Sequence, residues 1–136
     1  MEELSRNKLQ EISMNIIYDY LTYISMGKEF NPEEEISKVF DLPYEECDDF
    51  VKSICLATII HINEAIEHLS KYLIKWKFER LNRVAQSILL LAYSNFYYVN
   101  DADKKVVINV AVKLSKKYLD DGDYKYINAV LDKALC

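Results

Sequence analysis

The sequence predicts an all-α fold, a compact bundle of six or seven helices in one domain. Among 136 residues there are only 2 Gly and 2 Pro, so the residues that form tight turns and punctuate sheets are scarce. Hydrophobic residues make up 51% of the chain, which is enough for a substantial core. They recur at helical spacing through most of the sequence. Helices with short connections account for this pattern.

The first predicted helix spans residues 5–24, where apolar residues recur every three or four positions. Gly27 ends it, because glycine readily adopts the left-handed conformation that follows many helices. A second, short helix runs to about residue 40. Asn31 can cap its first turn, and Pro32 fits its first helical position.

A long helical stretch follows from about residue 44 to residue 73, after Leu42 and Pro43 break the second helix. Residues 59–62 are apolar nearly all round, so this stretch is expected to cross the middle of the core, and a bend is compatible with that course. Residues 76–81 form a short connecting turn. The next helix begins at Asn82 or Arg83 and runs to Val99.

Two further helices complete the chain. Asp101 or Asp103 can cap the first, which runs to Leu119. Gly122 suits a left-handed position after it, and Asp123 can cap the last helix. The positions expected to face the core are Val107, Val110 or Ala111, Leu114 and Tyr118 in the first, and Ile127, Val130, Leu131 and Ala134 in the second.

Charge is distributed unevenly along the chain. The formal net charge is −5, which does not suit a simple nucleic-acid binder. Residues 1–70 hold 5 Lys/Arg and 15 Asp/Glu, a net of −10, whereas residues 71–136 hold 12 and 7, a net of +5. This asymmetry indicates one face that attracts an anion and another that repels it. The alternative is that both sets are solvated helix faces.

The expected location is cytoplasmic. No apolar run is long enough to span a bilayer, and two glutamates near the start do not fit a secretory signal. The cysteines Cys47, Cys55 and Cys136 are odd in number and lack paired spacing, which predicts buried free thiols rather than disulfides or structural zinc.

The sequence contains no motif for catalysis, so we expect no enzyme, no metal and no cofactor. There is no nucleophile motif and no glycine-rich phosphate loop. Glu64, Glu67 and His68 share one side of a helix, but a metal site in a bundle needs a Glu-x-x-His from each of two helices. A solvated polar face is the expected role for these three. A helical enzyme or metal protein stays open as a third reading.

Tyrosine is abundant, with 11 residues. Aromatic rings can stack on unpaired bases while nearby Lys or Arg side chains hold the phosphates. Tyr18, Tyr124, Tyr126 and the aromatic residues of segment 93–98 are the candidates. Tyrosines in bundles also pack at the edge of the core with the hydroxyl in water, so no single ring is decisive.

The order of residues resembles the NusB family of bacterial transcription antitermination factors, over nearly the whole chain. The matching segments are 5–8 and 16–18 at the start, Trp76 to Leu81, 84–92, Val106 to Asn109 (similar to Val-x-Ile-Asn-Glu), and Tyr126 to Asp132 (similar to Phe-Val-Asn-Gly-Val-Leu-Asp). The last two are specific. The match between residues 50 and 73 is weak.

This resemblance implies two helical subdomains, approximately 1–75 and 76–136, and a role in processive transcription of ribosomal RNA operons. Family members bind the boxA element of single-stranded nascent RNA together with NusE, a ribosomal protein, within the transcription elongation complex. No membrane is involved. Family members occur as monomers and dimers, which leaves a homodimer open.

By position, the resemblance implies that Arg6 and Lys8 hold RNA phosphates and that Tyr126 contacts RNA; Lys125, next to Tyr126, is predicted to join this RNA-binding set. Tyr18 would lie at the surface shared by RNA and partner. The amides of Asn109 and Asn128 are expected to tie neighbouring helices together.

The departures from the family pattern concern charge. Asn7 and Gln10 are neutral where basic residues are usual, and three family glutamates are missing. One of these is replaced by Ala85, at the surface that family members use for complex formation. The alternative to an RNA-binding factor is therefore a divergent protein–protein adaptor that kept the fold and lost, or weakened, its RNA binding.

Overall fold

The computed structural model describes residues 4–100 and 102–136, and over these residues the chain is helical with no strand. The α-helices are α1 (Arg6–Ser25), α2 (Pro32–Phe40), α3 (Asp49–Ile60), α4 (Ile62–Ser70), α5 (Arg83–Ser94), α6 (Lys104–Tyr118) and α7 (Asp123–Ala134). Two short 3₁₀ helices, η1 (Tyr44–Glu46) and η2 (Phe78–Arg80), and one π-helical turn, η3 (Asn95–Val99), connect them. The predicted all-α class and helix number are confirmed.

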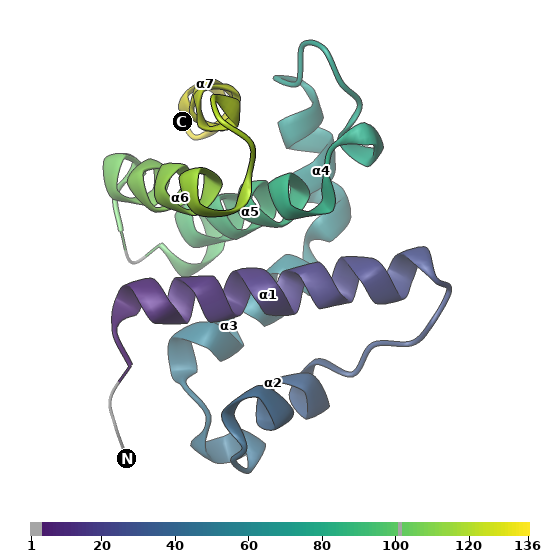
Figure 1. Ribbon diagram of the computed structural model, residues 1–136. Coiled ribbons are helices and arrows are strands. Elements are labelled where there is room, and N and C mark those ends of the chain that lie inside the picture. Colours follow the sequence, from purple (N-terminus) through teal and green to yellow (C-terminus); the bar gives the residue numbers. More distant parts are fainter. Residues whose placement is uncertain (1–3, 101) are drawn as a thin grey trace.

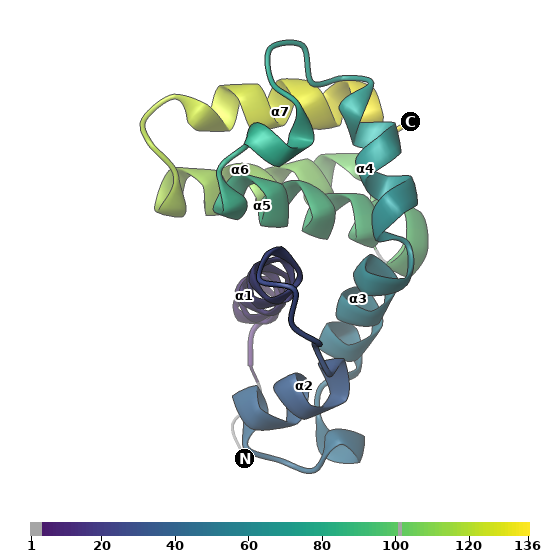
Figure 2. The ribbon, with the colours of Figure 1, turned by 90° about the vertical axis from the view of Figure 1, so that its right-hand side faces the viewer.

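Helix α1 crosses the middle of the molecule, with α2 and α3 on one side of it and α5, α6 and α7 on the other (Figure 1). Figure 2, in which α1 is seen end-on, shows α5, α6 and α7 running across it. Helix α4 packs against α5 and α7. Since α4 lies before residue 75, this packing does not single out residue 75 as a boundary, and the two subdomains stay a prediction.

Both α1 and α2 begin with a side-chain cap, and the one at Asn31 was predicted. The Ser5 hydroxyl accepts a hydrogen bond from the backbone N–H of Lys8 at 3.2 Å, and the Asn31 side chain accepts one from Glu34 at 3.1 Å. Gly27 follows α1 with a φ of 68°, in the left-handed region that glycine tolerates.

The predicted single stretch from residue 44 to 73 is wrong in its continuity. Cys47 is extended, and the Asp48 carboxylate caps α3 by accepting the N–H of Val51 at 2.9 Å. Since this cap starts a helix, η1 and α3 are separate elements. The bend considered near residues 59–62 is present, because His61, with φ −106° and ψ 17°, separates α3 from α4.

The last connections differ in detail from the prediction. Asp103 caps α6 by accepting the N–H of Val106 at 3.0 Å, while Asp101 lies outside the described residues. Gly122 is left-handed with a φ of 90°, as predicted. However, Gly122 itself is the cap position of α7 and Asp123 is the first helical residue, so the predicted cap by Asp123 is wrong.

Helix α5 forms the centre of the core. Its residues Ile88, Leu89 and Leu90 are fully buried, because helices α1, α3, α4, α6 and α7 all pack against it. The predicted inward residues of α7 are buried, as are Val107, Ala111 and Leu114 of α6. Tyr118 is a correction: its side chain is 41% exposed, because it reaches sideways to α1 instead of into the core.

Within the described ranges, no helix is both long enough and apolar enough to cross a membrane.

Candidate nucleic-acid interface

Arg6 and Lys8, which were predicted to bind RNA phosphates at the start of α1, face different ways. Residues two positions apart in a helix are separated by about 200° around its axis, so these two lie on opposite sides of α1. The Arg6 guanidinium lies over the ring of Phe50 in α3, 4.2 Å from its centroid. The Lys8 ammonium lies 3.9 Å from the carboxylate of Glu11 on the side of α1 that meets α6.

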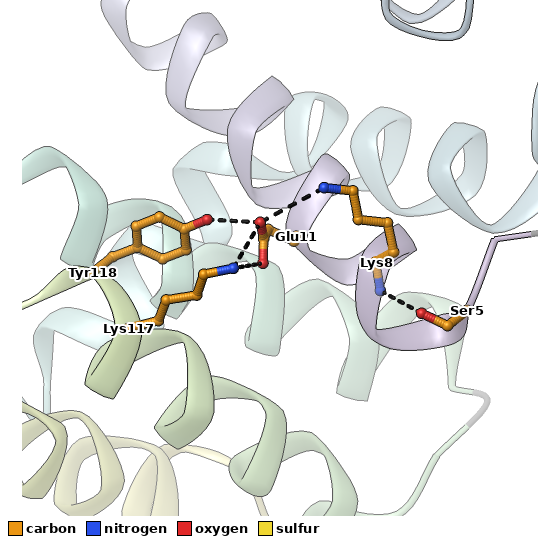
Figure 3. Close-up of polar contacts among 5 residues, drawn as sticks. All are labelled: Ser5, Lys8, Glu11, Lys117 and Tyr118. Atoms are coloured by element: carbon orange, nitrogen blue, oxygen red, sulfur yellow. Dashed lines mark hydrogen bonds and ion pairs between the residues drawn. The ribbon is translucent and has the colours of Figure 1, made fainter.

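Glu11 is the centre of a polar junction between α1 and α6 (Figure 3). The Lys117 ammonium donates to both of its carboxylate oxygens, at 2.9 and 3.2 Å, and the Tyr118 hydroxyl donates at 2.7 Å. These hydrogen bonds, that of Tyr118 first, hold the pKa of the Glu11 carboxyl below its usual value. Sequence reasoning missed this junction, because it expected Tyr118 to face the core.

Tyr18 lies further along α1, roughly 15 Å from Lys8 along the helix axis. Its side chain is 36% exposed, and the Arg83 guanidinium lies 5.9 Å from its ring centroid. Arg83 also donates to the hydroxyls of Thr22 and Ser25, at 3.1 and 3.2 Å. The start of α5 is thereby fastened to the second half of α1, beside an exposed ring.

Tyr126 lines a groove of about 370 Å³ between α7, η2 and the start of α5. Trp76, Arg80 and Ala85 are among the other residues that line it. Trp76 is 55% exposed, whereas Ala85 is only 7% exposed and forms part of the floor. An exposed indole and a tyrosine ring, with two cations, Lys75 and Arg80, against one carboxylate, Asp123, suit a planar, anionic ligand such as a nucleotide. Lys125, next in sequence to Tyr126, is exposed.

The last turn of α6 connects the two ends of the chain. Lys117 and Tyr118 reach α1, while the ammonium of the adjacent Lys116 lies 4.6 Å from the ring centroid of Tyr124 in α7. Lys8 and the start of α7 are therefore linked through α6. Arg6 is not part of this link, because it faces α3.

A comparison with known protein families decides to which family the chain belongs. The family model described as "NusB family" matches residues 7–135, which is nearly the whole chain. The chain belongs to the NusB family.

Relatives and solved structures agree with this assignment. The transcription antitermination protein NusB of Psychromonas ingrahamii is 32% identical over 139 residues, covering 99% of this chain and 90% of that protein. The NusB of Chloroherpeton thalassium is 25% identical over 133 residues, and the match covers 95% of this chain but only 60% of that longer protein.

Two solved structures share the fold. That of Thermotoga maritima NusB superposes with a TM-score of 0.81 at 20% identity, covering 98% of this chain and 92% of that one. A NusB solved with NusE and double-stranded RNA superposes with a TM-score of 0.74 at 22% identity, covering 96% and 95%.

The two neutral replacements in the NusB opening differ in position. Asn7 is exposed and lines a hollow between α1 and α6. Gln10 is 4% exposed and points into the core beside α5, so it adds nothing to the surface.

The expected structural role of the two asparagines of the NusB motifs is wrong. Asn109 on α6 and Asn128 on α7 are both exposed. In the part of the chain that the structure describes, neither side chain forms a hydrogen bond with another helix. Both amides face solvent because they lie away from the buried sides of their helices.

Both histidines of this chain lie against tyrosine rings, His61 against Tyr98 and His68 against Tyr93. His68 Nδ1 lies 2.8 Å from the Tyr93 hydroxyl, and the Tyr98 hydroxyl donates to Glu64 at 2.8 Å. Across residues 4–100 and 102–136, no three His, Cys, Asp or Glu side chains are grouped so as to hold a metal ion. Of the cysteines, Cys47 and Cys55 are buried as predicted, but Cys136 is exposed.

Proposed function

We propose that this chain is a transcription antitermination factor that binds boxA-type single-stranded RNA together with the ribosomal protein NusE. It would act in the cytoplasm, within the transcription elongation complex, and would catalyse no reaction. The observation that carries the proposal is the match to the NusB family over residues 7–135, combined with an aromatic groove lined by Trp76, Arg80 and Tyr126. One solved structure of this fold is a complex of NusB with NusE and RNA.

The groove supplies what an unpaired base requires. Tyr126 and Trp76 offer ring faces for stacking, and Arg80 offers a cation at the rim. Lys125 lies beside this groove in sequence, and Lys8 would hold phosphates at the start of α1. Arg6 belongs to the proposed RNA set as well, although its guanidinium lies over Phe50 and would contribute from the α3 side.

The partner surface is proposed around Tyr18 and Ala85. Tyr18 presents an exposed ring next to Arg83, a combination common in protein interfaces. Ala85 lies in the first turn of α5, about 200° around the axis from Arg83, and would contribute to the partner surface from the floor of the groove. NusE would thus bind along the second half of α1, while the RNA occupies the side of α6 and α7.

A fluorescence titration tests the proposal. Labelled boxA RNA and a scrambled RNA of equal length are titrated with the protein, alone and with NusE. We expect tighter binding of boxA than of the scrambled RNA, increased further by NusE. Equal affinity for both RNAs in the presence of NusE contradicts the proposal.

The second candidate is a NusB-fold adaptor in which RNA binding is weakened. The observation that favours it is the Glu11 carboxylate, which pairs with both Lys8 and Lys117 and so lowers the positive charge of the surface. Pull-down of NusE by the protein, without any shift of boxA RNA in the same mixture, would support the adaptor.

A further inference from the structure

Lys113 and Lys117 of α6 have no counterpart among the residues that the proposed function uses. They lie one helical turn apart and both line a hollow of about 190 Å³ between α1 and α6. Asn7 and Glu11 form the α1 side of this hollow. The hollow is therefore a second concave feature of the surface, separate from the aromatic groove at Tyr126.

The charges around this hollow do not balance. Lys113 and Lys117 line it, and the Lys8 ammonium lies 3.9 Å from Glu11, the carboxylate that pairs with both Lys8 and Lys117. Within residues 4–100 and 102–136, Lys113 has no ionic partner. Three positive charges and one negative charge leave an excess of two, which is complementary to an anion.

Glu11 occupies the position that such an anion would take. The two lysine ammonium groups and the Tyr118 hydroxyl converge on its carboxylate, and all three can donate to a phosphate oxygen in the same way (Figure 3). Lys8 and Lys117 keep 56% and 58% of their side chains exposed, so solvent and a ligand can reach them. The Glu11 side chain is only 17% exposed, but its lysine partners reach it from solvent, and salt weakens ion pairs with an exposed partner, so an RNA phosphate can replace the carboxylate.

We propose that Lys113 and Lys117, together with Lys8, bind the phosphodiester backbone of single-stranded RNA, and that Glu11 holds this site in the absence of RNA. This inference rests on the proposed function, because it assigns a second RNA contact to the same protein. RNA that leaves the groove at Tyr126 would pass the last turn of α6 and then cross to α1. Glu11 acts as an internal competitor that weakens nonspecific binding of nucleic acid.

The salt dependence of RNA binding tests the proposal, since it counts phosphate contacts independently of sequence. Affinities of boxA RNA and scrambled RNA are measured by titration between low and moderate salt for the parent, Lys113→Gln, Lys117→Gln and Glu11→Gln. Each phosphate contact to a single strand contributes about 0.7 to the slope of log affinity against log salt. We expect each lysine variant to reduce the slope by about this amount with both RNAs.

Glu11→Gln is expected to bind both RNAs tighter than the parent, on the order of threefold at low salt, with a steeper slope. Glu67→Gln on α4 is the matched control for the change of net charge, because Glu67 is exposed and its helix packs against α5 and α7 rather than against the hollow between α1 and α6. Lys38→Gln on α2, on the other side of α1, is the control for the lysine variants (Figure 1). Circular dichroism melting shows that each variant is folded. Lys113 forms no bond to Glu11, so Lys113→Gln leaves the Glu11 junction intact and still tests the site if Glu11→Gln is destabilised.

The outcomes separate this proposal from the proposed function. The phosphate site is overturned if Lys113→Gln and Lys117→Gln have the same salt slope as Lys38→Gln. It is also overturned if Glu11→Gln binds RNA no tighter than Glu67→Gln does. Both results hold even if the parent prefers boxA RNA. If the parent binds boxA RNA and scrambled RNA equally while the variants show the expected changes in salt slope, the boxA assignment is refuted and the phosphate site is supported. Absence of RNA binding by the parent and by Glu11→Gln overturns both.

Discussion

Thr58 and Ser94 share a hydrogen bond of 2.7 Å between α3 and α5, with both residues buried. The Thr58 hydroxyl already donates its one proton to the carbonyl of Ile54, at 2.8 Å. Ser94 must therefore be the donor and Thr58 the acceptor. This bond joins the helix that ends in the His61 bend to the central helix of the core.

Thr58→Val is expected to destabilise the protein by about 1–3 kcal/mol, because it leaves the Ser94 hydroxyl buried without its acceptor. Ser94→Ala should cost less, since Thr58 keeps its bond to Ile54. Thermal unfolding of the two variants and of the double variant measures the coupling between them. Additive effects in the double variant would show that the bond contributes nothing.

Tyr126→Phe is expected to raise the melting temperature slightly and to leave RNA binding intact. The Tyr126 hydroxyl oxygen is buried without a hydrogen-bond partner, so its removal relieves a desolvation cost of about 1 kcal/mol. The ring that lines the groove is retained. Tyr126→Ala should instead weaken RNA binding by about 1–3 kcal/mol through the loss of stacking. Equal RNA affinities of the Phe and Ala variants would exclude the ring from the interface.

Glu11→Gln is expected to lower the melting temperature at neutral pH and to have little effect below about pH 4. The bonds from Tyr118 and Lys117 lower the pKa of the folded carboxyl, so its stabilisation is complete above the ordinary pKa of a glutamate. It is lost as the pH falls through the lowered value, because the protonated acid resembles the amide. Melting curves of the variant and the parent at pH 7 and at acidic pH measure this. A difference that is independent of pH would contradict it.

Asn128→Ala is expected to change the free energy of unfolding by less than about 0.5 kcal/mol, because the amide is exposed and forms no hydrogen bond to another helix. Asn128 lies about 200° around the axis of α7 from Tyr126, on the other side from the groove, so binding of boxA RNA is expected to be retained as well. Calorimetry of the variant, together with a titration of boxA RNA, measures both properties. A clear loss of stability would restore the structural role that the sequence motif implied.

The helices were predictable where local chemistry decides them. Ser5 and Asn31 cap α1 and α2 because their side chains accept hydrogen bonds within the first turn, whatever the rest of the chain does. Gly27 and Gly122 are left-handed for an equally local reason. The break at Asp48 was missed because its cap competes with a run of residues that could also continue a helix.

The sequence by itself determined the all-α class, most helix positions and the family, since these follow from periodicity, caps and the order of residues. Only the tertiary structure decided which cations act together. Lys8 and Lys117 are far apart in the chain, and Glu11 joins them because α6 ends against α1. It also turned Arg6 toward Phe50 and brought Tyr118 to the surface. The direction of a side chain at the edge of a helix depends on its neighbour, and no repeat within the helix encodes that neighbour.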